Sequence, residues 1–178
     1  MKDSFESQRL VLYPLSLEDY QAFENGVEPS WQGFSNPYRH LVEGPHPLAH
    51  RIPRVKLNPA FATIGLVLAI EKETMQIIGS SGFHDFPDER GMIEIGFGIV
   101  PEKQNQGFGT ELLMAMWKMI TQHPDVKVLR YTVSPDNAPS IHIINKLGFE
   151  RVGEQMDEED GVEIIYEQSR DLFLSQSN

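Results

Sequence analysis

Glu94-Ile-Gly-Phe-Gly-Ile-Val-Pro-Glu-Lys-Gln-Asn-Gln-Gly-Phe-Gly-Thr110 is the stretch that decides the fold. Residues 92–100 alternate apolar side chains with glutamate and glycine, which is the period of a half-buried strand. Residues 104–110 form a glycine-rich turn, and the apolar residues after it recur at helical spacing. We therefore expect a strand, a turn and a helix whose first turn presents free backbone N–H groups to an anion.

The turn places Gly107 and Gly109 on either side of Phe108. A phosphate-binding loop of the Gly-Lys-Ser/Thr type is excluded because that ending is missing, and the dinucleotide fingerprint needs a third glycine where Leu112 stands. A two-glycine turn at a helix start remains, which is a plausible cradle for a pyrophosphate and is also often only a turn.

The rest of the chain fits one domain, residues 1–178. Its length suits a single core, and 40% hydrophobic residues argue against disorder. Cysteine is missing, which excludes disulfides, thiolate metal ligands and a cysteine nucleophile. A formal charge of −11 argues against general nucleic-acid binding, and it is compatible with a cationic partner. With no long apolar run and no signal peptide, we expect a cytoplasmic protein that does not bind membranes.

The periodicity predicts a mixed sheet. A short strand at 9–13 precedes a helix that Ser16 caps and that Asn25-Gly26 ends. Further strands are expected at 63–71, 76–83, 92–100 and 126–133, and a hairpin at 149–156 and 162–168. A helix is expected at 137–147, with Asn137 or Ala138 as its cap. Short turns join the first three of these strands into an antiparallel meander, and a crossover helix joins 92–100 to 126–133 in parallel. The expected class is α/β (α+β), with a mostly antiparallel central sheet flanked by helices.

Four motifs in order resemble one family. Gln104-Asn-Gln-Gly-Phe-Gly109 looks like the Gln/Arg-x-x-Gly-x-Gly/Ala signature of the GNAT N-acetyltransferases. The strand before it, Ser134–Ser140 with Asn145–Phe149, and the opening Gln8–Leu15 resemble the ribosomal-protein N-acetyltransferase branch. The resemblance spans nearly the whole chain, and the combination is far more specific than any single piece.

The resemblance implies that acetyl-CoA is the cosubstrate, without a metal, and that an amine attacks its thioester directly in a ternary complex. The N–H groups from Gln106 to Thr110 would hold the pyrophosphate, and the strand end at Ile99 and Val100 would bond to the pantetheine arm like an added strand. The cofactor contacts expected from the whole motif are Ile99, Val100, Gln104, Asn105, Gln106, Gly107, Phe108, Gly109, Thr110, Asn137 and Ser140.

The acetyl transfer needs a base for the amine and an acid for the leaving thiolate. Glu94 is the first candidate base because it points to the glycine face of its strand; the alternative is a structural carboxylate. His84 is the rival base, although a lone histidine there is more often ordinary surface. The branch implies that Ser140 meets the thiolate and that Asn137 holds the pantetheine. The tyrosine acid of other members is replaced by Ile144, which leaves the acid open.

Residues 29–60 are the hardest to interpret, since they hold half of the twelve prolines. In the resembling family this region covers the acceptor pocket, so Trp31, Phe34 and Tyr38 are candidate substrate contacts or else local core. His40, His46 and His50 invite a metal site, but no acidic residue is spaced with them as a facial triad requires.

The predicted function is acetyl transfer to a primary amine, either a small molecule or a protein N-terminus. One alternative is a catalytically silent module that binds acetyl-CoA and acts as a sensor or partner protein. Another is a different nucleotide-binding domain that uses the Gly107–Gly109 turn. The oligomeric state is left open, a homodimer included.

Overall fold

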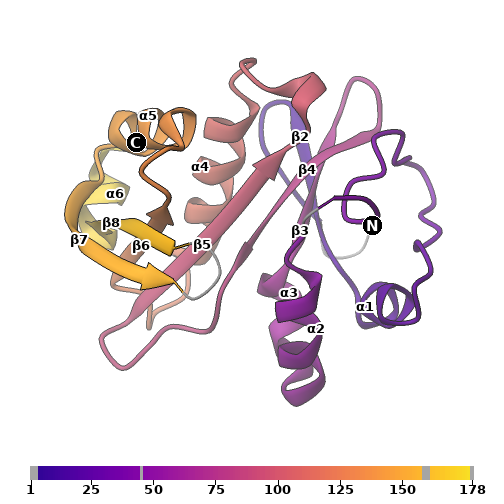
Figure 1. Ribbon diagram of the computed structural model, residues 1–178, viewed down its shortest axis with the longest axis horizontal. Coiled ribbons are helices and arrows are strands. Elements are labelled where there is room, and N and C mark those ends of the chain that lie inside the picture. The colour runs from indigo at the N-terminus through magenta and orange to yellow at the C-terminus, as the bar shows by residue number, and fades with distance from the viewer. Residues whose placement is uncertain (1–3, 45, 158–160, 177–178) are drawn as a thin grey trace. The chain divides into compact units, whose positions relative to one another are not determined.

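The structure is a computed structural model that describes residues 4–44, 46–157 and 161–176 (Figure 1). Its strands form one sheet in the order β1-β2-β3-β4-β5-β6-β8-β7. The strands are β1 (Phe5–Glu6), β2 (Leu10–Pro14), β3 (Val67–Glu71), β4 (Gln76–Phe83), β5 (Met92–Ile99), β6 (Val128–Val133), β7 (Glu150–Asp157) and β8 (Gly161–Ser169). The helices are α1 (Leu17–Glu24), α2 (Leu48–Leu57), α3 (Ala62–Gly65), α4 (Phe108–Ile120), α5 (Ala138–Lys146) and α6 (Arg170–Gln176), with 3₁₀ turns η1 (Pro59–Phe61) and η2 (Pro101–Lys103).

The chain divides into two compact units that share β5. The first unit comprises residues 1–84 and 97–115, and the second comprises residues 85–96 and 116–178. Only the pair of β5 and β6 is parallel among the register pairs described, and the pairs of β1–β2, β2–β3, β3–β4, β6–β8 and β7–β8 are antiparallel. The predicted fold class, a mixed and mostly antiparallel sheet with flanking helices, is confirmed.

In the first unit, β3 lies between β2 and β4 (Figure 1). Every residue of β3 is buried, and the strand has a paired neighbour on each edge. The predicted start of α1 is confirmed: the Ser16 hydroxyl accepts from the Asp19 N–H, and the Asp19 carboxylate accepts from the Ser16 N–H. Gly26, with φ of +71°, follows the helix end as expected.

The strand predicted at 63–71 begins later than expected. Residues 62–65 are the short helix α3, and β3 starts at Val67. Asn58 caps the turn η1 just before α3, and Gly65 packs so closely that a Cβ there would lie 2.8 Å from the Phe61 ring. An apolar run of this length has no period of its own, so it cannot separate a buried strand from a buried helix. The elements β1, α2 and α6 were not predicted.

In the second unit, Met92 to Ile95 of β5 pair in parallel with Val128 to Tyr131 of β6, as the crossover pattern predicted. The Asn137 side chain caps α5 by accepting from the Ser140 N–H, also as predicted. Trp117 of α4 stacks on Phe149 at 5.7 Å between ring centroids. The expected hairpin is β7–β8, and residues 158–160 of its acidic turn lie outside the described part of the chain.

No helix in the described ranges combines the length and apolar character that crossing a bilayer requires.

Candidate active site

The glycine turn lies in the first unit and opens α4. Gly107 has a φ of +82° and Asn105 a φ of +59°, so the chain turns through the left-handed region twice before the helix. The first helical hydrogen bond runs from the Glu111 N–H to the Gly107 carbonyl at 3.1 Å. The N–H groups of residues 108–110 therefore belong to the first helical turn, where no intrahelical acceptor is available. This arrangement suits an anion.

Two glutamine side chains close the turn onto η2 and the end of β5. The Gln104 amide donates to the Ile99 carbonyl at 2.9 Å, and the Gln106 amide donates to the Glu102 carbonyl at 3.1 Å. The two amides thus tie the turn to the backbone of the residues just before it, which restrains its conformation.

Arg9, the residue before β2, holds the start of α4, and sequence reasoning assigned it no role. Its guanidinium bonds to the Glu111 carboxylate at 2.7 Å and to the Gln106 carbonyl at 3.0 Å, and it lies 4.2 Å from the centre of the Phe108 ring. The Glu111 carboxylate also accepts from the Arg9 N–H and from the Ser7 hydroxyl. Burial raises the pKa of Glu111, but these hydrogen bonds and the positive charge outweigh it, and the pKa is lowered overall.

The end of β5 lies against β4. The Val100 N–H donates to the Ile78 carbonyl at 2.9 Å, and a Cβ at Gly79 would clash with the Gly98 carbonyl oxygen. Only a glycine permits this close approach of two strands. Of the two strand-end residues expected to meet the pantetheine, Val100 thus has its N–H bonded to β4, and Ile99 has its carbonyl bonded to Gln104.

A buried ion pair fixes the other side of the turn. The Lys103 ammonium binds the Glu71 carboxylate at 2.6 Å, and the Thr74 hydroxyl donates to the same oxygen at 2.6 Å. Burial raises the pKa of Glu71, but the hydrogen bonds from Lys103 and Thr74 outweigh it and lower the pKa. Since Lys103 is bound by Glu71, its charge is already balanced within the protein.

Two of the three aromatic residues predicted to contact substrate pack locally around α1. The Trp31 indole donates to Asp19 at 3.0 Å, and its ring stacks on Phe34 at 5.5 Å. Phe34 also contacts Tyr13 at 5.3 Å between ring centroids. The third, Tyr38, lies elsewhere, with its hydroxyl 3.5 Å from the Gln76 side chain of β4. Trp31 and Phe34 are half-buried, so this packing leaves both the substrate role and the local-core alternative as predictions.

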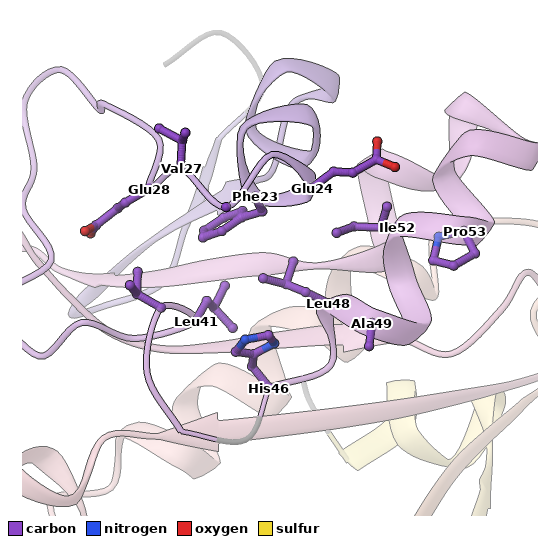
Figure 2. A pocket seen from close by; sticks show the side chains of 12 residues that line it. Phe23, Glu24, Val27, Glu28, Leu41, His46, Leu48, Ala49, Ile52 and Pro53 are labelled. Atoms are coloured by element: carbon purple, nitrogen blue, oxygen red, sulfur yellow. The ribbon is translucent and has the colours of Figure 1, made fainter.

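A cavity of about 420 Å³ lies between α1, α2 and the segment that joins them (Figure 2). Phe23, Leu41 and Leu48 face one another across it, and His46 lies below them in this view. The twelve lining residues are Phe23, Glu24, Gly26, Val27, Glu28, Leu41, Val42, His46, Leu48, Ala49, Ile52 and Pro53.

The rim of this cavity is acidic. Glu24 and Glu28 lie at opposite ends of the cavity in Figure 2, and each binds a cation of the protein itself. Glu24 is paired with Lys56 at 2.7 Å, and Glu28 with Arg39 at 3.6 Å. Mobile surface pairs of this kind are weak, so a ligand cation can replace the lysine or arginine at little cost.

The second unit holds three of the predicted catalytic and cofactor residues. The Glu94 carboxylate accepts from the Thr132 hydroxyl at 2.6 Å. Asn137 and Ser140 lie together at the start of α5, joined by the cap at 3.2 Å, and Ser140 is hydrogen-bonded to Tyr131 of β6. Burial raises the pKa of Tyr131 and the bond to Ser140 lowers it, with a net increase. Tyr131 and Thr132 are neighbours in a strand, so these two contacts lie on opposite faces of β6.

The rival base, His84, follows the last residue of β4 in the first unit and is partly exposed. Within the described ranges, no group of three or more His, Cys, Asp or Glu side chains is arranged to hold a metal ion.

Three further residues with defined contacts were missed: Arg9, Thr132 and His40, whose imidazole lies 2.8 Å from the Ser80 hydroxyl. Arg9 is part of the opening motif Gln8–Leu15, but that motif does not show that Arg9 binds Glu111. For Thr132 and His40 the sequence carries no local signal, because their partners are 38 and 40 residues away.

The sheet order and the glycine turn at the start of α4 agree with an acetyltransferase fold. The chain belongs to the GNAT acetyltransferase family: the family model described as "Acetyltransferase (GNAT) domain" matches residues 9–150. The predicted family is therefore confirmed.

Curated relatives carry the same family name. The chain is 31% identical over 84 residues to the uncharacterized N-acetyltransferase p20 of Bacillus licheniformis, a match that covers 47% of each chain. The chain thus spans about half the length of this relative. It is 25% identical over 158 residues to the uncharacterized N-acetyltransferase YoaA of Bacillus subtilis, with 83% of each chain covered.

Solved structures share the fold. A GNAT-family acetyltransferase from Bacillus anthracis has a TM-score of 0.64 at 20% identity, covering 94% of this chain and 99% of its own. The spermidine/spermine N-acetyltransferase SpeG of Vibrio cholerae reaches 0.67 at 15% identity, with 96% and 100% covered. A ribosomal-protein-S5-alanine acetyltransferase of Vibrio fischeri reaches 0.67 at 14% identity, with 94% and 97% covered. The neighbours thus include the expected ribosomal-protein branch beside polyamine enzymes, and at these identities they show the fold alone.

Proposed function

We propose that this protein transfers an acetyl group from acetyl-CoA to a primary amine, by direct attack of the amine in a ternary complex. Family membership supports the reaction class, and the names of p20 and YoaA agree with it. The observation that carries the proposal is the start of α4, where Gly107 and the N–H groups of residues 108–110 form an anion cradle held by Arg9.

The residues present fit acetyl-CoA. Gly107 has the left-handed backbone that favours glycine, and Arg9 Nη2 lies 3.4 Å from the position that a Cβ would take there, so a positive charge stands beside the turn. The N–H groups 108–110, with Gln106 and Asn105 before them, would hold the pyrophosphate, and Ile99 and Val100 would line the arm. Acetyl-CoA, when bound, supplies the acetyl group as an activated thioester.

The candidate base and acid have suitable surroundings within the second unit. We assign Glu94 the removal of a proton from the acceptor ammonium, because its carboxylate is held by Thr132 in one position. Ser140, in contact with Tyr131, would donate a hydrogen bond to the leaving sulfur as the C–N bond forms and the C–S bond breaks. The CoA thiolate leaves, and the second proton lost from the attacking nitrogen neutralises it.

The cavity between α1 and α2 is our candidate for the chain of the acceptor. Its wall is apolar at Phe23, Leu41 and Leu48, and the carboxylates of Glu24 and Glu28 stand at its ends. An amine with an apolar segment and a second cationic or polar group is complementary to that arrangement.

Calorimetric titration with acetyl-CoA tests the first half of the proposal, and thiol release with a panel of amines tests the second. Micromolar binding with thiol release for at least one amine is expected. Binding without turnover across peptide N-termini, polyamines and aromatic amines would instead favour a silent sensor module. Absence of acetyl-CoA binding together with tight ATP binding would favour a different nucleotide-binding domain.

A further inference from the structure

The segment between α1 and α2 crosses β4 in the first unit, and we call its residues 35–44 the strap. The strap is tied to β4 by its backbone at Ser35, whose N–H donates to the Met75 carbonyl at 3.0 Å and whose carbonyl accepts from the Ile77 N–H at 2.9 Å. A second attachment is made by a side chain: the His40 imidazole Nε2 lies 2.8 Å from the Ser80 hydroxyl. Ser80 is buried.

The backbone around His40 is strained. Arg39 and Leu41, the residues on either side, have φ angles of +49° and +64°, in the left-handed region that side chains other than glycine rarely occupy. Such strain costs free energy and persists where the surroundings over-determine it, often at functional sites. Leu41 is held by burial, at 3% exposed, beside the cavity between α1 and α2.

The Asn36 side chain clamps the same turn. Its carbonyl oxygen accepts from the His40 N–H at 2.9 Å, and its amide donates to the His40 carbonyl at 3.0 Å. The same amide also donates to Glu28 at 2.9 Å, at the end of the cavity. The Asn36 side chain and the left-handed residues Arg39 and Leu41 therefore fix the turn that carries the His40 imidazole to β4.

Ser80 lies beside the point where β4 meets the end of β5. Ile78 bonds to Val100, and Gly79, the residue next to Ser80, is the close approach to Gly98. The strap and the end of β5 thus bond to neighbouring residues of β4. Under the proposed function, Ile99 and Val100 line the acyl-CoA arm, and Ser80 is one residue along β4 from Gly79 and two from Ile78, which contact that strand end.

We propose that His40 is a positioning residue of the acetyl-transfer site, which holds the Ser80 hydroxyl and the strap in one arrangement beside the end of β5. This inference rests on the proposed function and adds a residue that neither the family motifs nor the four sequence motifs include. His40 acts through Ser80 and takes no proton in the reaction.

The charge state of His40 suits that role. Burial, and to a smaller extent the neighbouring His46, lowers its pKa to about 4. The ring is therefore neutral at neutral pH, with one nitrogen that donates and one that accepts. A neutral ring keeps the hydrogen bond to Ser80 and does not repel a cationic amine, as an imidazolium would.

Three variants test the kinetic consequence. His40→Leu removes the hydrogen bond, His40→Gln retains a side-chain nitrogen and oxygen, and Ser80→Ala removes the partner. We expect His40→Leu to lower kcat at least tenfold with an acetyl-CoA Kd within twofold of the parent, and His40→Gln to recover most of kcat. The double variant His40→Leu/Ser80→Ala should have a kcat no lower than that of His40→Leu alone, because the two changes remove the same hydrogen bond.

A spectroscopic experiment gives a readout that does not depend on turnover. Imidazole nitrogen NMR signals of the parent protein are followed during titration with acetyl-CoA, and separately with adenosine 3′,5′-bisphosphate, which lacks the acyl arm. The His40 signals should shift with acetyl-CoA alone, while those of the exposed His123 stay unchanged with both.

The outcomes separate this inference from the function on which it rests. If the parent protein binds acetyl-CoA and the His40 NMR signals do not shift, the role of His40 is overturned. The same holds if folded His40→Leu keeps the parental kcat. In both cases the proposed acetyltransferase function stands. Loss of kcat together with an equal loss of acetyl-CoA affinity overturns the role of His40 too, because a merely structural role would produce that pattern. Absence of acetyl-CoA binding by the parent protein overturns the proposed function itself, and the role of His40 with it.

Discussion

The guanidinium of Arg9, the residue before β2, binds the carboxylate of Glu111 in the first turn of α4 at 2.7 Å, across 102 residues of sequence. The same guanidinium bonds to the Gln106 carbonyl and covers the Phe108 ring. A side chain from the start of the protein therefore fixes the turn that we assign to the pyrophosphate. This contact explains how a glycine-rich turn, which is flexible by composition, is kept in one shape.

Replacing Glu111 by glutamine should lower both stability and cofactor affinity. The change leaves the Arg9 guanidinium without its charged partner, for which we expect a loss of about 1–3 kcal/mol in the free energy of unfolding. The acetyl-CoA Kd should rise because the turn is held less firmly. Urea unfolding and calorimetry measure the two effects. Glu24→Gln, the same change in an exposed pair with Lys56, should cost about 1 kcal/mol or less.

The stability effect of Glu111→Gln should depend on pH. The pKa of Glu111 is lowered in the folded protein, so its carboxylate stabilises the fold above the unfolded pKa of about 4.3, and this contribution is lost as pH falls through the folded value. Parent and variant should therefore converge in acid. A difference in stability that stays constant down to pH 2 would contradict the ion pair as its cause.

Gly107→Glu should abolish acetyl-CoA binding in a protein that still folds. The new carboxylate would stand where the pyrophosphate is expected, and like charges repel. Gly161→Glu is the matched control, since Gly161 has a similar φ of +78° and open space around it, so it carries the same backbone cost. Unchanged affinity in folded Gly107→Glu would remove the cradle assignment.

Glu94→Gln should lower kcat by about 10²–10⁴-fold, the usual contribution of a general base, and leave the acetyl-CoA Kd unchanged. Thr132→Val removes the hydroxyl that donates to the Glu94 carboxylate at 2.6 Å. Because a hydrogen bond favours the charged carboxylate, this variant should shift the acid limb of the pH–rate profile to higher pH without abolishing activity. A Glu94→Gln protein with the parental pH–rate profile would exclude Glu94 from the mechanism.

The free energy of unfolding should fall as pH is lowered from about 6.5 to about 4 because of His40. Its folded pKa is lowered to about 4 by burial and by His46, so in this window the unfolded chain binds the proton more readily and unfolding is favoured. The loss should be at most about 3 kcal/mol, since His40 is only partly buried. His40→Gln should lack this component in urea unfolding at several pH values. The groups around the imidazole are Ser80 on β4 and His46 and Asn36 on the connecting segment.

Ala49→Trp should raise KM for the acceptor amine severalfold and leave the acetyl-CoA Kd unchanged. Ala49 is exposed on the wall of the cavity between α1 and α2, so an indole there fills part of its 420 Å³ without disturbing the core. Ala60→Trp, an exposed alanine outside that cavity, is the control. If Ala49→Trp keeps the parental KM for a panel of acceptor amines of different length, the acceptor binds outside this cavity.

Local patterns in the sequence were enough for much of the fold. Strict alternation predicted β5, the Ser16 and Asn137 caps predicted the starts of α1 and α5, and paired glycines predicted the turn before α4. Each of these signals lies within a few residues, so the chain carries it without tertiary help. The apolar run at 63–71 failed because both a buried strand and a buried helix satisfy it, and packing of Gly65 against Phe61 decided the outcome.

The candidate site divides in the same way. The sequence by itself predicted the family, which the family match confirms, and the glycine turn before α4, because that turn is one continuous segment whose backbone conformation depends on its own glycines. Anion binding at this turn stays a prediction. Only the tertiary structure decided that Arg9 holds that cradle, that Thr132 orients Glu94 and that His40 meets Ser80. Such pairs join segments 38 to 102 residues apart, and a charge or a hydroxyl has no period that could reveal its partner. Their geometry depends on contacts between distant segments. The conformational entropy lost in bringing those segments together is offset by packing across the whole sheet.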